Sequence, residues 1–251
     1  IILNYNIKFD SKNIKKYKIN VFVSPRFILP FFKPIGVKFI TVIHDLSFLT
    51  YKHNPFRIYM NLVMYMKVLM PFIVKRADAI VVDSYFVKKE LEKVYRVESK
   101  KIEVIYPGSD DFFYPNKNET AFLELIKKYH IQKKFIFTTA TNHERKNIFG
   151  LVDAFKEIKQ FNDYQLVICG LLPDFTITKL EKYLQKMNLT EKVKFLGFVS
   201  KNELRVLYSF AKLFVFPSFE EGFGLPVLES VLCGCLPICS DAGALPEVIG
   251  N

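Results

Sequence analysis

Hydrophobic residues occur along this chain in short, nearly continuous runs, and the segments between the runs show helical periodicity. Runs of Val, Ile, Phe and Leu of this kind are typical of strands covered on both faces, and therefore of parallel sheets. The pattern predicts nine strands, at residues 19–24, 38–45, 79–84, 102–108, 135–140, 164–170, 193–198, 213–218 and 236–241.

The segments between the strands predict helices over residues 84–95, 147–161, 200–211 and 225–232. Ser84 is a good capping residue for the first of these, and Ser200 and Glu203 have the spacing of a capping box at the start of the third. Pro226 suits the first turn of the fourth helix, where no backbone donor is needed. The alternation of strands and helices predicts a doubly wound α/β architecture.

The segment 107–119 is polar and rich in turn-forming residues, and it has no clean periodicity. We therefore expect two domains, 1–113 and 114–251. The second contains five predicted strands, enough for most of one Rossmann-like sheet. The first contains four and has no Gly-rich turn between an opening strand and helix, so we expect it to be incomplete.

Positive charge is concentrated in the first half of the chain. Residues 1–115 contain 19 Lys and Arg against 10 Asp and Glu, a net charge of +9, whereas residues 116–251 contain 17 against 15, a net charge of +2. Such a surface favours anionic partners such as phosphates or acidic lipid head groups; the alternative is a basic, solvated surface. Nucleic acid is not expected as a partner, because no recognition motif accompanies the charge.

The most apolar long segment, 58–74, is interrupted by Asn61, Lys67 and Pro71 and is too short to span a bilayer. We expect it to form a buried or interfacial helix, and we expect an anionic membrane surface as a partner. No metal site is expected, because Cys233, Cys235 and Cys239 lack the spacing of a metal-binding knuckle.

The stretch "FEEGFGLPVLE", at 219–229, follows a predicted strand and begins a predicted helix. Ligands of open α/β sheets bind beyond the carboxyl ends of the strands, and a helix N-terminus favours an anion. Glu221 and Glu229 would repel a phosphate but accept hydrogen bonds from sugar hydroxyls. The pattern therefore predicts a ligand that has a diphosphate in the middle and hydroxyls at both ends.

Two adjacent cations, Arg145 and Lys146, follow the predicted strand 135–140 and precede a helix. They are either part of a solvated turn or a clamp for phosphate groups. We favour the phosphate clamp, because the pair lies between the carboxyl end of a strand and the start of a helix.

The sequence also resembles a known family. "ERKN", "LVDAFKEI" and "VKFLGFVSKNELRVLYSFAKLFVFPSFEEGFGLPVLESVLCG" are similar to the donor-binding domain of the retaining family-4 glycosyltransferases, the group 1 glycosyltransferases. "VIHDLSF", "RADAIVVDSYFVKKEL" and "KIEVIYPGSD" resemble the second part of their acceptor domain. The resemblance implies a GT-B fold of two Rossmann-like domains. It also implies a chain truncated at both ends, without the first βα units and without the last helices.

The resemblance assigns roles to residues of this chain. Arg145 and Lys146 would hold the donor pyrophosphate, Glu221 would contact the transferred sugar, and Glu229 would bind the ribose hydroxyls. Val199 would lie near the base. The backbone that lines the sugar and the phosphates would come from Gly222, Phe223, Gly224 and Leu225.

His44, at the end of a first-domain strand, would face the reacting sugar. Without the resemblance, it would be taken as a core or turn histidine beside Asp45. Ala140 departs from the family, which usually has glycine there, so the backbone would approach the phosphates less closely.

The resemblance implies a metal-independent enzyme that transfers a hexosyl group with retention of configuration. The groups expected to act in catalysis are His44, Arg145, Lys146 and Glu221. The "HDL" motif, at 44–46, and the helix after it resemble the mannosyl-transferring branch. We therefore expect mannose or a similar sugar.

The acceptor would be a glycan or a lipid-linked molecule in surface polysaccharide synthesis, with the enzyme in the cytoplasm at the inner face of the membrane. The co-substrate would be a nucleotide diphosphate sugar, linked to GDP or UDP, and no cofactor is expected. The alternatives are a truncated module that binds a sugar nucleotide without turnover, and another GT-B activity such as a sugar-nucleotide epimerase.

Overall fold

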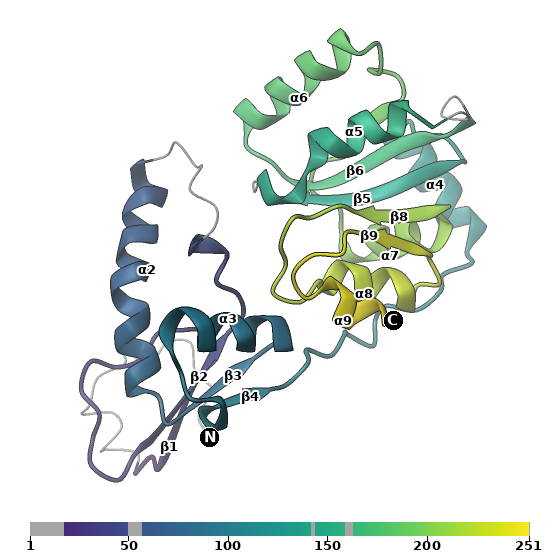
Figure 1. Ribbon diagram of the computed structural model, residues 1–251. Helices are drawn as coiled ribbons and strands as arrows, with labels where there is room; N and C mark the ends of the chain where they lie inside the picture. The colour runs from purple at the N-terminus through teal and green to yellow at the C-terminus, as the bar shows by residue number, and fades with distance from the viewer. Residues whose placement is uncertain (1–17, 50–56, 142–143, 159–162, 251) are drawn as a thin grey trace. The chain divides into compact units, whose positions relative to one another are not determined.

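The computed structural model describes residues 18–49, 57–141, 144–158 and 163–250. The chain forms two compact units, Ile1–Pro107 and Gly108–Asn251 (Figure 1). Each unit contains one parallel sheet with helices packed against it, and each is described by itself.

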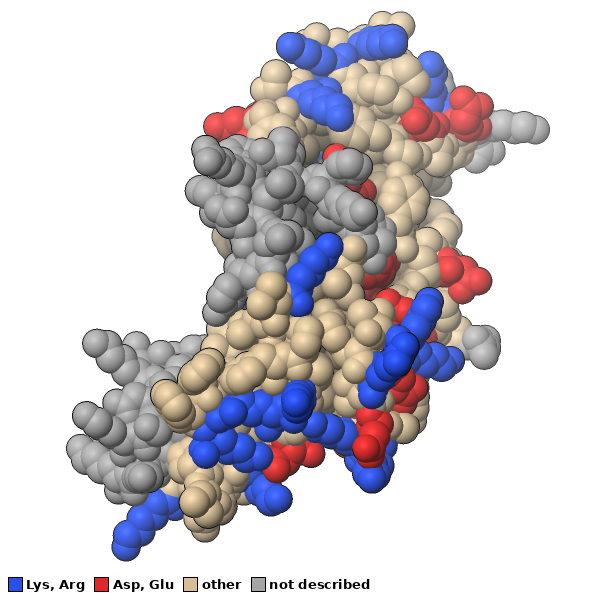
Figure 2. Space-filling view, turned by 60° about the vertical axis from the view of Figure 1, so that its left-hand side comes forward, with Lys and Arg blue, Asp and Glu red and all other residues tan. Residues whose placement is uncertain are grey.

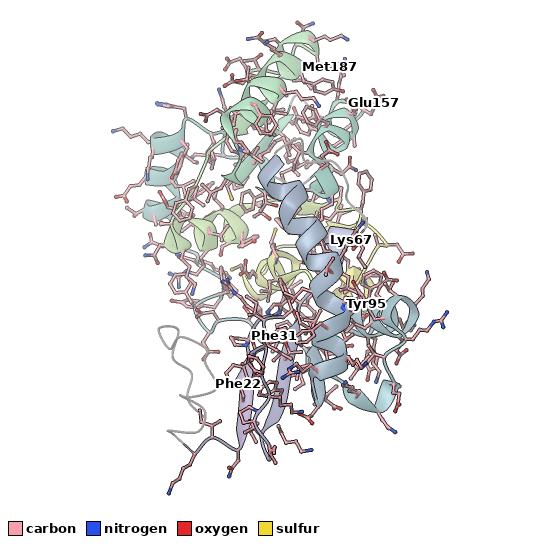
Figure 3. The ribbon with its side chains drawn as sticks, turned by 90° about the vertical axis from the view of Figure 1, so that its left-hand side faces the viewer. Phe22, Phe31, Lys67, Tyr95, Glu157 and Met187 are labelled. Atoms are coloured by element: carbon pink, nitrogen blue, oxygen red, sulfur yellow. The ribbon has the colours of Figure 1, made fainter. Side chains whose placement is uncertain are left out.

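The sheet of the first unit has the strand order β1-β2-β3-β4, and all of its strands are parallel. Its elements are β1 (Val21–Ser24), β2 (Lys38–Ile43), η1 (Ser47–Leu49), α2 (Arg57–Arg76), β3 (Ala79–Val82), α3 (Tyr85–Tyr95), η2 (Ser99–Lys101) and β4 (Ile102–Val104). Phe39 and Ile80 of the sheet are fully buried, as are Met70 and Ile73 of α2 and Leu91 of α3. Phe31, in the loop between β1 and β2, stacks on Phe72 of α2, with 5.6 Å between the ring centroids, and Figure 3 shows it near that helix.

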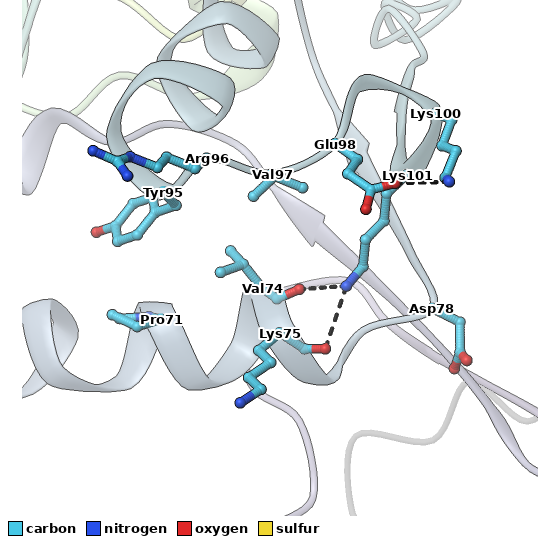
Figure 4. Close-up of a pocket in the computed structure, with 10 residues that line it drawn as sticks. All are labelled: Pro71, Val74, Lys75, Asp78, Tyr95, Arg96, Val97, Glu98, Lys100 and Lys101. Atoms are coloured by element: carbon cyan, nitrogen blue, oxygen red, sulfur yellow. Dashed lines mark hydrogen bonds and ion pairs between the residues drawn. The ribbon is translucent and has the colours of Figure 1, made fainter.

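A lysine stabilises the carboxyl end of α2. Lys101 Nζ donates to the carbonyl oxygens of Val74, at 2.6 Å, and Lys75, at 3.3 Å, within a hollow lined by α2, α3 and η2 (Figure 4). The last carbonyls of a helix have no partner within the helix and carry partial negative charge, so a cation there is favourable. Burial lowers the pKa of Lys101. In the described part of the chain, no helix is long and apolar enough to cross a bilayer.

The sheet of the second unit has the strand order β7-β6-β5-β8-β9, and all of its strands are parallel. Its elements are α4 (Glu119–Tyr129), β5 (Phe135–Thr141), η3 (Glu144–Lys146), α5 (Ile148–Lys156), β6 (Gln165–Leu171), α6 (Asp174–Lys186), β7 (Val193–Phe195), α7 (Lys201–Phe210), β8 (Leu213–Phe216), α8 (Leu225–Leu232), β9 (Pro237–Cys239) and α9 (Leu245–Ile249). The first strand of the unit, β5, lies between β6 and β8. The strand order therefore reverses between β5 and β8, which is the switch point where ligands of such sheets bind.

Two apolar clusters cover the two faces of this sheet. One is centred on Phe137, Tyr208 and Phe214, and the other on Val152 and Ile168. The first four residues of β5 and the first five of β6 are all buried, as expected for strands covered on both faces. In the first unit, by contrast, buried residues alternate with more exposed ones along β2 and β3.

The nine strands predicted from the sequence are confirmed, and most are shorter than predicted. The capping box of α7 forms both of its bonds, between Ser200 and Glu203, and Ser84 Oγ accepts a hydrogen bond from Val87 N at 3.2 Å at the start of α3. The helix predicted over 147–161 ends at Lys156, and residues 159–161 lie outside the described residues. The prediction of a helix over 225–232 is confirmed by α8.

Candidate donor-binding site

Side chains from the carboxyl ends of two neighbouring strands meet in the second unit. Arg145 and Lys146 are in η3, directly after β5, and Glu221 is in the loop after β8. Because β5 and β8 are paired and parallel, the loops that follow them start at the same edge of the sheet. The site therefore forms at the switch point.

Glu221 forms ion pairs with both cations. Its Oε2 lies 2.5 Å from Arg145 Nη1, and its Oε1 accepts a hydrogen bond from Lys146 Nζ at 2.7 Å. The side chains are 8% exposed for Glu221 and Lys146 and 13% for Arg145. One carboxylate is therefore shared by two nearly buried cations, and these three side chains together have a net charge of +1. Such a cluster attracts an anion, because charges interact strongly away from water.

Hydrogen bonds and ring contacts fix the two cations in place. Arg145 Nη1 donates to the carbonyl oxygen of Glu220 at 2.6 Å, and the Arg145 carbonyl accepts from Phe219 N at 2.8 Å. Lys146 Nζ lies 4.3 Å from the centroid of the Phe216 ring. The buried Nε of Arg145 has no hydrogen-bond partner among the described residues, so the guanidinium keeps an unused donor.

The backbone of Glu221 is held by a segment that the sequence analysis did not identify. Ala244 N donates to the Glu221 carbonyl oxygen at 3.0 Å. Gly243 has a φ of +61°, and a Cβ added to it would lie 2.6 Å from both N and O of Glu221. Only glycine permits both this conformation and this close approach. No local pattern could reveal the contact, because the two segments lie far apart in the sequence.

The loop after Glu221 turns at a glycine into α8. Gly224 is the N-cap residue of α8, with a φ of +114°, and a Cβ there would lie 2.7 Å from Leu245 Cδ2. Gly222 and Gly224 are buried, whereas Leu225 is exposed. The first N–H groups of a helix have no intrahelical partner, and they favour an anion.

Glu229 lies in the second turn of α8, in a different setting from Glu221. Its Oε2 accepts a hydrogen bond at 3.2 Å from the hydroxyl of Tyr208, a fully buried side chain of α7. Burial raises the pKa of Glu229, while the bond to Tyr208 and the charge of Lys201 act in the opposite direction. Tyr208 was not identified from the sequence, because a tyrosine on the apolar side of a helix looks like an ordinary core residue.

Three further residues that the sequence analysis singled out lie in the same unit. Val199 is buried, and it immediately precedes Ser200, the N-cap residue of α7. Phe223 is partly exposed in the loop before α8. Ala140 is buried in β5.

His44 belongs to the first unit, where it follows the last residue of β2. Its side chain is 55% exposed, so it is not a core histidine. Asp45 does not bind the ring, since its Oδ1 accepts hydrogen bonds from the N and Oγ of Ser47. The roles predicted for His44 and for the donor-site residues stay predictions.

A parallel sheet with cationic side chains at its switch point defines an α/β protein of the Rossmann-like, ligand-binding class. Family comparisons are more specific. The model described as "Glycosyl transferases group 1" matches residues 122–251, and that described as "Glycosyltransferase Family 4" matches residues 11–111. The chain belongs to the group 1 glycosyltransferases.

Curated relatives include O-antigen chain mannosyltransferase B of Escherichia coli, which is 28% identical over 242 residues covering 95% of this chain and 61% of the relative. O-antigen chain mannosyltransferase RfbU of Salmonella typhimurium is 33% identical over 190 residues, covering 74% of this chain and 49% of the relative. The chain thus spans about half to three fifths of the length of these relatives.

Two solved structures show the fold. Anabaena Alr3699/HepE in complex with UDP and glucose has a TM-score of 0.70 and 18% identity, over 86% of this chain and 56% of that one. WaaG, a glycosyltransferase involved in lipopolysaccharide biosynthesis, has a TM-score of 0.70 and 14% identity, over 95% and 64%. The α/β GT-B fold expected from the sequence is confirmed.

We predict that Glu221→Gln lowers the free energy of unfolding by about 3 kcal/mol, because it leaves two buried cations without their counter-charge. Inorganic pyrophosphate should then raise the thermal midpoint of this variant more than that of the unchanged protein, since phosphate oxygens replace the missing charge. Urea unfolding and thermal denaturation measure the two effects.

Glu144→Gln is the matched control, because it removes the same charge from an exposed residue next to Arg145. Equal stability of the two variants would contradict the account of the ion pairs.

Proposed function

We propose that this chain is part of a retaining glycosyltransferase. It would transfer a hexosyl group, mannose or a similar sugar, from a nucleotide diphosphate sugar to a glycan or lipid-linked acceptor in surface polysaccharide synthesis. The observation that carries the proposal is the contact of Arg145, Lys146 and Glu221 at the switch point of the second sheet. Membership of the group 1 glycosyltransferases and the similarity to O-antigen mannosyltransferases support it.

In this proposal the cations bind the leaving diphosphate. As the bond from the anomeric carbon to the diphosphate breaks, negative charge grows on the phosphate oxygens, and Arg145, Lys146 and the N-terminus of α8 stabilise it. These fixed charges would take the place of a metal ion. Glu221, freed from part of its pairing by the phosphates, would accept hydrogen bonds from the transferred sugar. Glu229 would accept hydrogen bonds from the ribose.

The proposal of a lipid-linked acceptor rests on the positive surface charge of the first unit. Lys and Arg side chains are gathered on the surface of the first unit, with fewer Asp and Glu between them (Figure 2). A basic surface of this kind is attracted to an anionic bilayer, by about 1 kcal/mol for each cation close to it. A lipid-linked acceptor at the inner face of the membrane fits this distribution.

Transfer is tested with a panel of GDP and UDP sugars, with product detection by mass spectrometry and donor binding measured separately by calorimetry. Lys146→Ala should lower the transfer rate about a hundredfold or more, because it removes charge stabilisation of the leaving group. Lys212→Ala is the matched control, since Lys212 is an exposed lysine that immediately precedes β8 at its other end. A Lys146→Ala variant with full activity would refute the proposal.

The same assay separates the alternatives. Binding of a sugar nucleotide without transfer to any acceptor indicates a binding module, and an altered donor sugar without an acceptor indicates an epimerase.

The affinity for GDP or UDP should depend on the ionisation of Glu229. Because burial raises the pKa of Glu229 above 4.5, the carboxylate is lost as the pH falls through the raised value, and ribose binding weakens. On acidification from neutral pH we expect the affinity to fall in the unchanged protein but not in Glu229→Gln, after allowance for the titration of the phosphates.

Tyr208→Phe removes the hydrogen bond that favours the charged form of Glu229. The loss of GDP or UDP affinity on acidification should therefore begin at a higher pH in this variant. Calorimetric titration across the pH range measures the effect. The same pH dependence in the unchanged protein and Glu229→Gln would rule out ribose binding by Glu229.

A further inference from the structure

Three neighbouring strands of the first unit end at one imidazole ring. His44 follows β2, Pro25 follows β1 and Asp83 follows β3, and β2 lies between the other two in the sheet. His44 Nδ1 is 2.7 Å from Asp83 Oδ2, and His44 Nε2 is 3.1 Å from the carbonyl oxygen of Pro25. The ring is thus held at the edge of the sheet where ligands bind in this class of fold.

The two partners of the ring determine its charge. A carboxylate and a backbone carbonyl are both hydrogen-bond acceptors. A neutral imidazole has only one N–H, so it can donate to one of these partners but not to both. Both bonds form only when both ring nitrogens carry protons, which makes His44 a cation. In agreement with this geometry, the bond to Asp83 raises the pKa of His44, and burial opposes the shift only in part.

The two bonds differ in strength. Asp83 is charged, its side chain is only 15% exposed, and its bond to the ring is the shorter one. The Pro25 carbonyl is neutral, and its bond to the ring is longer. The turn that contains Pro25 is held separately, because Ser24 Oγ and Thr41 Oγ1 donate to the Arg26 carbonyl at 2.5 and 3.1 Å. An incoming ligand oxygen can therefore replace Pro25 at Nε2 more readily than it can replace Asp83 at Nδ1.

We propose that Asp83 is a positioning residue for His44: it anchors Nδ1–H and keeps the ring a cationic donor, whose Nε2–H binds an oxygen of a ligand. The identity of that ligand rests on the proposed function, whereas the Asp83–His44 pair does not. Among the described residues, the other charged group that acts on the ring is Asp45, which raises the pKa of His44 less than Asp83 does and is itself hydrogen-bonded to Ser47.

The pair is tested by NMR titration of the histidine ring signals in the full chain, with His44→Gln used to assign the His44 signal. In the unchanged protein the pKa of His44 should lie above its ordinary value of about 6.5. Nitrogen shifts at neutral pH should show protons on both ring nitrogens. A pKa at or below the ordinary value would overturn the proposal, and this measurement needs no variant.

Asp83→Asn keeps a hydrogen-bond acceptor of the same shape but removes the charge. It should lower the pKa of His44 by about one unit or more. Asp45→Asn is the matched control, since it removes the neighbouring carboxylate that does not bind the ring, and it should shift the pKa of His44 far less. Equal shifts in the two variants, or no shift in Asp83→Asn, would overturn the assignment of Asp83.

The binding of a ligand by Nε2–H of His44 is tested separately, through the pH dependence of transfer. Where transfer is measurable, the rate should fall as the pH rises through the pKa of His44, and Asp83→Asn should move this fall to lower pH. A shifted His44 pKa without any transfer would count against the proposed function but leave the pair standing. Transfer whose pH dependence is the same in Asp83→Asn would overturn the role of Nε2–H in ligand binding.

Discussion

The site depends on the burial of two cations against one carboxylate. Taking Arg145, Lys146 and Glu221 out of water is costly unless their charges are paired and their hydrogen bonds are made. Pairing β5 with β8 brings these residues together, so the strand order of the sheet and the chemistry of the site are inseparable. Because one positive charge stays unbalanced, the cluster is ready to receive an anion, and a sugar nucleotide supplies two phosphates.

The same principle operates in the first unit with different residues. There the carboxyl ends of three adjacent strands converge on His44, and Asp83 compensates its charge. In both units a polar side chain is fixed by partners from neighbouring strands rather than by its own loop. A rigid sheet can therefore hold each group in the geometry that a reaction needs, because hydrogen bonds between strands prevent their ends from moving independently.

Much of the fold could be predicted from the sequence, because short, nearly continuous apolar runs such as "QLVICG" are typical of strands covered on both faces. The capping box of Ser200 and Glu203 and the start of α8 were also predictable, since they depend on neighbours in sequence. Contacts between segments that are distant in the sequence could not be predicted. Gly243 against the Glu221 backbone, Tyr208 on Glu229 and Asp83 on His44 arise only when the strands are ordered in space.

The direct ion pairs between Glu221 and both cations were not foreseen either, because the sequence analysis gave these residues separate ligand groups. Their contact makes the binding of a diphosphate at this cluster the central claim. A crystal structure of the chain with GDP or UDP tests it most directly. We predict that phosphate oxygens lie within hydrogen-bond distance of Arg145 and Lys146, beside the start of α8. A diphosphate bound elsewhere, with the three side chains still paired as here, would contradict the account.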